Sequence, residues 1–161
     1  MKETKGVELR DGIHTGMNFA VLARADRFQK RRHAYKVWRA LREFGCRVYL
    51  VAPDLDKFEN SKVYSNLLLL RDKIDVVIPC LRTEFLENLV DQCVEAGAKY
   101  IWFQEKNWTA ELAAYGEEKG LIVIRGCCLK HKSFKKPWAF FNPCYWHGRR
   151  EKKVPVKHRR I

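Results

Sequence analysis

The stretch from Phe19 to Pro53 decides the fold, and it reads FAVLA, RADRFQKRRH, AYKVWRALREFG and CRVYLVAP in order. Its first and last parts are short apolar runs, which are typical of buried strands. Between them, apolar residues spaced three and four apart predict a helix over residues 34–44, and Gly45 is suited to end it. The stretch therefore predicts a βαβ unit, in which the loop after the first strand is the usual place for a phosphate. Here that loop is strongly basic.

The order of helix, glycine and strand recurs twice further along the chain. One helix has Thr83 as its predicted cap and ends at Gly97, and another starts at Thr109 and ends at Gly120. This alternation predicts an α/β fold with a parallel sheet covered on both faces. About five strands are expected, at residues 19–23, 47–51, 74–81, 98–103 and 121–124.

The length of 161 residues fits one domain with two extensions. We expect a lead-in at residues 1–17 with at most one short helix, an α/β domain at residues 18–130, and a basic, aromatic-rich extension at residues 131–161. Another short helix is expected at residues 65–71. No apolar run approaches the roughly 20 residues that a membrane span needs, and the first residues do not resemble a signal peptide. We therefore expect a cytoplasmic protein, without a membrane partner, whose six cysteines are reduced.

The formal net charge of +13 is unevenly distributed. Residues 24–36 carry six basic residues and one acidic residue, and residues 126–161 carry eleven and one, whereas the rest of the chain sums to −2. This excess indicates an anionic partner, either the phosphates of a small ligand or nucleic acid bound through the basic tail. The alternative is a solvated surface that only aids solubility. Because parallel strands end at one edge of a sheet, both basic segments are expected there.

Several segments in register resemble the small bacterial and archaeal CoA-binding proteins that are related to the CoA-binding domain of succinyl-CoA synthetase. They are Val51-Ala52-Pro53, Val63 to Leu67, Gly97 to Gln104, and Cys128-Leu129-Lys130, and the likeness covers roughly two thirds of the chain. The resemblance implies a Rossmann-like three-layer sandwich. It also implies non-catalytic binding of CoA, acyl-CoA or a related phosphorylated nucleotide at the carboxyl edge of the sheet.

The resemblance also implies residue roles. Arg24 and Arg27 would hold phosphate, Pro53 and Arg82 would line the nucleotide cleft, and Gln104 and Lys130 would close it. The complete expected cofactor-binding set is Ala23, Arg24, Ala25, Arg27, Ala52, Pro53, Leu81, Arg82, Gln104 and Lys130.

The chain departs from the family at the phosphate loop. Where the family has a G-x-S loop, this sequence has Ala23-Arg24-Ala25, and no glycine occurs between Met17 and Phe44. A close approach of the backbone to phosphate is harder without glycine. Two alternatives follow: basic side chains replace the backbone amides, or CoA binding is lost and the basic loop and tail serve a nucleic-acid-associated or protein-interaction module. The side chains in question are Arg24, Arg27, Lys30, Arg31 and Arg32.

The extension contains the spacing of a candidate zinc site, because Cys128-x-x-His131 is followed by Cys144-x-x-His147. Two thiolates and two imidazoles at such spacing can supply four tetrahedral ligands. The simpler interpretation is that Cys128 is the family's cysteine and Cys144 is a core residue, so no metal is expected.

The aromatic residues between 134 and 146 lie among lysines, as in stacking platforms for single-stranded nucleic acid. Alternatively, they pack against the sheet or against a second subunit, which would make a homodimer. No catalytic motif is present, so we expect that the protein is not an enzyme. The competing hypothesis of an enzyme in the same cleft would need an acid or base with a perturbed pKa, and only His33 and Glu105 are candidates at the predicted edge outside the tail.

Overall fold

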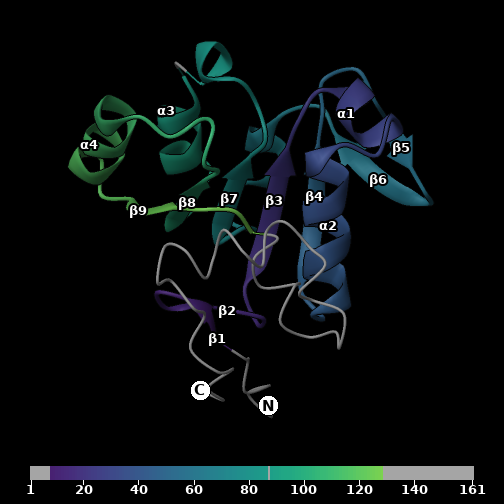
Figure 1. Ribbon diagram of the computed structural model, residues 1–161, viewed down its shortest axis with the longest axis horizontal. Coiled ribbons are helices and arrows are strands. Elements are labelled where there is room, and N and C mark those ends of the chain that lie inside the picture. The colour runs from purple at the N-terminus through teal and green to yellow at the C-terminus, as the bar shows by residue number, and fades with distance from the viewer. Residues whose placement is uncertain (1–7, 87, 129–161) are drawn as a thin grey trace.

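A computed structural model describes residues 8–86 and 88–128, and its core is a seven-stranded sheet with the order β5-β6-β4-β3-β7-β8-β9 (Figure 1). Six of these strands are parallel, and only β5 runs antiparallel, against β6. The five strands expected from the sequence are confirmed as β3, β4, β7, β8 and β9. The bounds are β3 Asn18–Leu22, β4 Arg47–Val51, β5 Lys57–Phe58, β6 Ser61–Tyr64, β7 Val76–Pro79, β8 Tyr100–Phe103 and β9 Ile122–Arg125.

Helices cover both faces of the sheet, which confirms the three-layer α/β sandwich (Figure 1). Strand β3 shows the division: Phe19 and Val21 belong to the buried cluster that contains Trp38 of α2, whereas the intervening Ala20 and Leu22 belong to the cluster of α3. This alternation follows from the two-residue period of a strand, and it buries β3 on both faces. The helical elements are α1 Ala25–Gln29, α2 His33–Glu43, η1 Leu67–Leu70, η2 Thr83–Phe85, α3 Leu89–Glu95 and α4 Ala110–Glu118.

Several element boundaries agree with their predicted chemistry. The Thr109 side chain accepts a hydrogen bond from the Leu112 backbone N–H at 3.1 Å, so it caps α4 as expected. Gly45, which follows α2, has φ +83°, a left-handed conformation that favours glycine. The short helix expected at residues 65–71 is the 3₁₀ turn η1, whose Asn66 side chain accepts from the Leu68 N–H at 2.9 Å.

Other expectations at the element level are wrong. The described part of the lead-in forms a hairpin of β1 Glu8–Arg10 and β2 Ile13–His14 rather than a helix, because Ile13 and Leu9 bury their side chains in the core shared with α2. Thr83 does not cap the third helix: it starts the separate turn η2, and α3 begins only at Leu89. The basic loop contains the short helix α1, which the sequence did not predict.

Strands β5 and β6 were also missed. They form a hairpin across the tight turn Glu59-Asn60, where both residues have positive φ, 43° and 64°. β6 then adds to the edge of β4 in parallel. Among the described residues, no helix combines the length and the apolar character that crossing a membrane requires.

Candidate ligand-binding cleft

A cleft of about 680 Å³ lies beyond the carboxyl ends of β3, β4, β6 and β7. The chain leaves β3 for β4 on one side, whereas β7 pairs with β3 on the other, so this edge is a topological switch point. Open α/β sheets bind ligands in the crevice outside such a point. The lining residues are Leu22, Ala23, Arg24, Val51, Pro53, Ser65, Asn66, Leu67, Leu81, Glu84, Asn88, Leu89 and Gln92.

The structure brings four of the predicted site residues together in this lining: Ala23, Arg24, Pro53 and Leu81. Ala52, between two of them, is fully buried, and its backbone N–H donates to the Tyr64 carbonyl at 2.9 Å. It therefore holds β4 and β6 together beneath the cleft rather than facing it.

The remaining predicted residues lie elsewhere. Ala25 and Arg27 are part of α1, beside the cleft but outside its lining, and Arg82 is exposed at the start of η2. Gln104 is buried and is also absent from the lining. Lys130 lies outside the residues that the structure describes.

The segment that replaces the glycine loop is organised around one carboxylate. Asp26, in the first turn of α1, lies 3.4 Å from Arg24 Nε and 4.0 Å from Arg27 Nε. The Arg24 side chain is 61% exposed and the Arg27 side chain is 40% exposed. Ion pairs at such exposure contribute little free energy, so Arg24 can exchange Asp26 for a ligand phosphate without a large penalty. A phosphate here would meet guanidinium groups, which suit its geometry.

The other cations of the basic loop do not reach the cleft. Arg31 has φ +50° and its guanidinium lies 3.8 Å from Glu59, on the outer side of α2. Lys30 and Arg32 are exposed and are also absent from the cleft lining. Within the lining itself, Arg24 and Glu84 are the two charged residues, so the cleft is mainly apolar with a polar rim.

Two buried amides hold the carboxyl edge at β8. Asn107 accepts from the Gln104 backbone N–H at 2.8 Å and donates to the carbonyls of Pro79 and Leu81 at 2.7 and 3.0 Å. It thereby fixes the backbone of Leu81, which lines the cleft. Asn107 follows the strand predicted at residues 98–103, but the sequence pattern did not indicate that its side chain is a brace, because an asparagine after a strand usually marks an exposed turn.

The Gln104 side chain lies between the last strands and α2. Its Oε1 accepts from the Cys128 backbone N–H at 3.2 Å, which fixes the orientation of the amide, and its Nε2 donates to the Trp102 carbonyl at 3.3 Å. The same Oε1 lies 3.0 Å from His33 Nε2, so that nitrogen is the donor and carries the proton. His33 is exposed by surface area, yet desolvation of the crowded site lowers its pKa and outweighs the raising effect of the Gln104 hydrogen bond. The neutral form is therefore favoured.

The five described cysteines are free thiols. Burial raises the pKa of Cys93, and burial together with the neighbouring Cys128 raises the pKa of Cys80, so both thiols are held in the unreactive protonated form. No group of three or more potential metal ligands occurs within residues 8–86 and 88–128. Of the zinc set, only Cys128 belongs to these residues; His131, Cys144 and His147 lie outside them, as do the tail aromatics.

The candidate acid and base of an enzyme are engaged in other contacts. Glu105 lies 3.7 Å from Arg125 Nε, and His33 bonds to Gln104. Neither residue lines the cleft. The described residues therefore offer a place to hold a ligand: a parallel sheet with a switch point, a mainly apolar crevice and one arginine at its mouth define a Rossmann-like ligand-binding domain.

Comparison with known proteins assigns this domain to a family. Residues 21–133 match the model of the family described as CoA binding domain. This match spans most of the chain, and the protein belongs to that family. The family resemblance seen in the sequence is thereby confirmed.

Individual relatives agree with the assignment. The chain is 26% identical over 130 residues to the uncharacterized protein YneT of Bacillus subtilis, covering 81% of this chain and 95% of that one. A hypothetical protein from Pyrococcus horikoshii superposes with a TM-score of 0.64 at 29% identity, covering 70% and 79% of the two chains. A dinucleotide-forming acetyl-coenzyme A synthetase from Ca. Korarchaeum cryptofilum shares the fold over 66% of this chain and 25% of its own, with a TM-score of 0.56 at 22% identity.

Proposed function

We propose that the protein binds CoA, acyl-CoA or a related phosphorylated nucleotide in the 680 Å³ cleft, without catalysing a reaction on it. The observation that carries the proposal is the position of the cleft. It lies at the switch point of the sheet, and its lining contains four of the residues that the family resemblance selects, among them Arg24 and Pro53.

The chemistry of the lining supports the same ligand class. Leu22, Val51 and Leu81 are among its apolar residues, which suit a base or a pantetheine arm. Asn66, Asn88 and Gln92 add amides that can donate to and accept from a nucleotide. Arg24 supplies the positive charge for phosphate, in place of the backbone amides of a glycine loop.

Isothermal titration of the purified chain with CoA, acetyl-CoA, ADP and NADP tests the proposal. We expect saturable binding of at least one of these nucleotides in the micromolar range. Arg24→Glu should weaken it about tenfold or more, because a favourable contact with phosphate becomes repulsive. Arg47→Glu is the matched control. Arg47 is exposed at the amino end of β4, opposite the cleft, and Arg47→Glu changes the net charge of the protein by the same amount as Arg24→Glu.

A second variant tests whether the nucleotide occupies the cleft, by reducing the volume of the cleft. Ser65 is exposed and lines the cleft, so Ser65→Trp should fill part of it and reduce nucleotide affinity without loss of the fold. Absence of binding to all four nucleotides at millimolar concentration would contradict the proposal. So would equal affinity in wild type, Arg24→Glu and Ser65→Trp.

The non-catalytic part of the proposal rests on the composition of the described lining, in which Glu84 is the one carboxylate and no histidine or cysteine accompanies it. Mass spectrometry of acetyl-CoA incubated with the protein should return the thioester intact. Free thiols at all five described cysteines also fit the proposed reducing, cytoplasmic location.

A further inference from the structure

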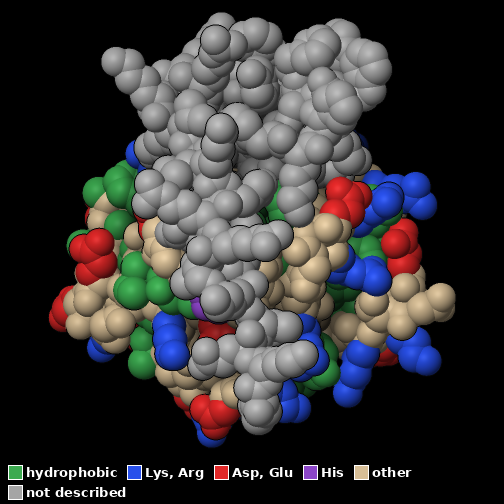
Figure 2. All heavy atoms as spheres, turned by 90° about the horizontal axis from the view of Figure 1, so that it is seen from below, with side chains coloured by type: hydrophobic (Ala, Val, Ile, Leu, Met, Phe, Trp, Pro, Cys, Tyr) green, Lys and Arg blue, Asp and Glu red, His purple; other side chains and the backbone are tan. Residues whose placement is uncertain are grey.

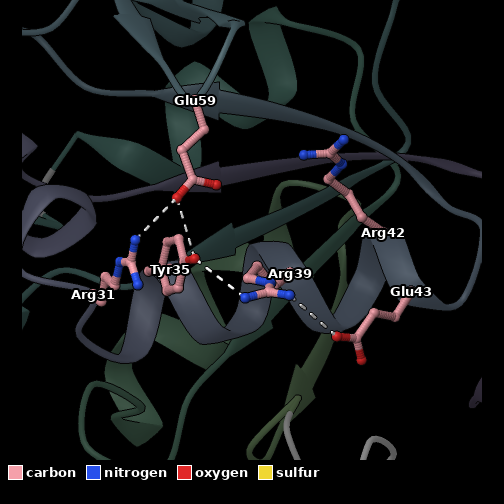
Figure 3. A pocket seen from close by; sticks show the side chains of 6 residues that line it. All are labelled: Arg31, Tyr35, Arg39, Arg42, Glu43 and Glu59. Carbon is pink, nitrogen blue, oxygen red and sulfur yellow. Dashed lines mark hydrogen bonds and ion pairs between the residues drawn. The ribbon is translucent and has the colours of Figure 1, made fainter.

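A second depression lies on the outer side of α2, and we call it the α2 arginine groove. It has a volume of about 500 Å³ and is lined by Arg31, Tyr35, Arg39, Arg42, Glu43 and Glu59. Figure 3 shows these side chains along the exposed side of the helix, with Glu59 reaching in from the turn between β5 and β6. It shares no lining residue with the ligand-binding cleft.

Two carboxylates and one tyrosine hold the guanidinium groups in place. Glu59 Oε1 accepts from the Tyr35 hydroxyl at 3.2 Å and lies 3.8 Å from Arg31, while Glu43 lies 3.9 Å from Arg39 (Figure 3). Arg39 also donates to the Tyr35 hydroxyl at 3.4 Å. A guanidinium has five N–H donors, so these contacts orient Arg31 and Arg39 and leave donors for an anion.

Arg42 completes the groove differently. Its guanidinium carbon lies 4.8 Å from the centre of the Trp38 ring, and no carboxylate of the described chain lies within ion-pairing distance of it. Arg32 and Lys36 continue the positive surface along the same helix; both are exposed and likewise form no ion pair with described residues. From Arg32 to Arg42 the helix rises about 15 Å.

Among the residues that the structure describes, positive charge is concentrated in the part of the chain that contains this helix. Residues 24–47 carry nine basic and two acidic residues, whereas residues 48–125 carry nine basic and thirteen acidic ones. In Figure 2, Lys and Arg side chains gather on the side of the molecule that carries α2, at the right of the view. An extended anionic partner on this side would meet mainly basic side chains, with Glu43 and Glu59 between them, whereas the acidic excess of residues 48–125 would repel it on the side of α3 and α4.

We propose that the α2 arginine groove, with Arg32 and Lys36 beside it, binds the phosphate backbone of nucleic acid. Along one strand of a duplex a phosphate recurs about every 3.4 Å of axis, so the 15 Å of basic helix spans about four phosphates. Arginines held in fixed positions suit such oxyanions through their bidentate geometry.

The groove also determines which kind of recognition is possible. The Tyr35 residue is 6% exposed, and Arg31 and Arg39 lie 5.5 and 5.9 Å from its ring centre. The ring is therefore covered and offers no platform on which a base could stack. Binding through this surface contacts phosphates only, so it has no sequence preference and is strongly salt-dependent.

Fluorescence anisotropy with a labelled 20-base-pair DNA duplex of arbitrary sequence tests the proposal on the full chain. We expect binding at 50 mM salt that weakens steeply with added salt. The double variant Arg39→Glu/Arg42→Glu should bind at least tenfold more weakly, with a log–log salt slope about two units shallower. The matched control is Lys73→Glu/Lys119→Glu, which makes the same change in net charge on exposed residues of the other side and should lose less than threefold.

Further measurements distinguish loss of the phosphate contacts from loss of the fold. Circular dichroism must show a folded double variant; if it does not, the neutral pair Arg39→Gln/Arg42→Gln is compared with Lys73→Gln/Lys119→Gln. Nucleotide binding in the cleft should be unchanged, which separates this proposal from the proposed function. No duplex binding, an equal loss in the control, a loss seen only on removing residues 149–161, or tighter binding to poly-glutamate would each overturn it.

Discussion

At the carboxyl end of β8, the buried side chain of Gln104 makes four contacts. Oε1 accepts from Cys128 N–H and His33, and Nε2 donates to the Trp102 carbonyl and to Cys128 Sγ, the latter at 3.2 Å. Gln104 is only 6% exposed. A buried amide with both ends bonded is favourable, but its partners depend on it.

Replacing this amide with an apolar side chain should therefore destabilise the protein. Gln104→Leu conserves approximate size and removes the side-chain oxygen that accepts from the buried Cys128 backbone N–H and the amide that donates to the Trp102 carbonyl. We expect a loss of about 1–3 kcal/mol in the free energy of unfolding, measured by urea denaturation. Gln29→Leu, at an exposed position of α1, is the control and should change it by less than about 0.5 kcal/mol. Equal stabilities of the two variants would show that the amide is dispensable.

The sequence predicted some individual site residues and not others, for a physical reason. Ala23, Arg24 and Pro53 directly follow strands that are evident from their apolar runs, so their place at the carboxyl edge could be inferred. Gln104 also follows a strand, but a side chain there can turn to either face of the sheet. Nothing in the one-dimensional pattern indicated that it turns toward Cys128. Glu84 and Asn88 were missed because the helix was predicted to begin too early.

At the scale of elements, α4 lies unusually close to the strand beneath it. A Cβ atom added to Gly116, in the middle of α4, would come within 2.8 Å of Cγ2 of Val123 in β9. This distance is shorter than real Cβ contacts allow, and a valine methyl on a strand cannot move far. The absence of a side chain at Gly116 therefore permits the spacing between helix and sheet.

This spacing predicts a reversal of the usual helix preference. In an exposed helix, Gly→Ala is stabilising by about 1 kcal/mol. Here Gly116→Ala should instead destabilise by about 1–3 kcal/mol, because it overpacks the interface. Thermal and chemical unfolding of Gly116→Ala, Val123→Ala and the double variant measure the coupling. We expect the double variant to be more stable than the sum of the single effects, whereas strict additivity would contradict the steric account.

Elements were predictable where local chemistry and periodicity agreed. Gly45, Gly97 and Gly120 all adopt positive φ after a helix, as expected. The repeated helix–glycine–strand order was therefore enough to predict the parallel core of the sheet. The pair β5 and β6 was not predictable in this way. These strands have two and four residues and contain lysines and a serine. β6 is a strand because β4 offers it an edge, and β5 is a strand because it pairs with β6. Tertiary pairing of this kind overrides weak local preference.

At the scale of the whole molecule, the positive charge around α2 opposes folding at low salt. Arg32, Lys36 and Arg42 are exposed and close along one helix, and no described carboxylate pairs with them. Repulsion among such charges is screened as the Debye length falls from about 30 Å at 0.01 M salt to about 8 Å at 0.15 M. The folded state should therefore gain stability with moderate salt.

We expect the free energy of unfolding to rise by about 0.5–1 kcal/mol between 10 and 150 mM sodium chloride, as measured by urea denaturation at pH 7. Arg32→Glu/Lys36→Glu should be more stable than wild type at low salt and should lose most of this salt dependence. The control pair Lys73→Glu/Lys119→Glu lies in the acidic part of the chain. It should be no more stable than wild type at low salt and should keep the wild-type salt dependence. A wild-type stability that does not change with salt would show that the charges are too well solvated to interact.

The central position of β3 has a consequence for how the chain reaches its structure. Phe19 lies opposite Val48 on one side and Val76 on the other, so the second partner of this strand comes 57 residues later along the chain. During synthesis, β3, α2 and β4 can associate early. The other edge of β3 stays unpaired for several seconds, until β7 has been synthesised. Contacts between such distant residues form slowly, and until they form the unpaired strand edge can pair with other chains and aggregate. We therefore expect this protein to be most prone to aggregation during synthesis, before residue 79 has left the ribosome.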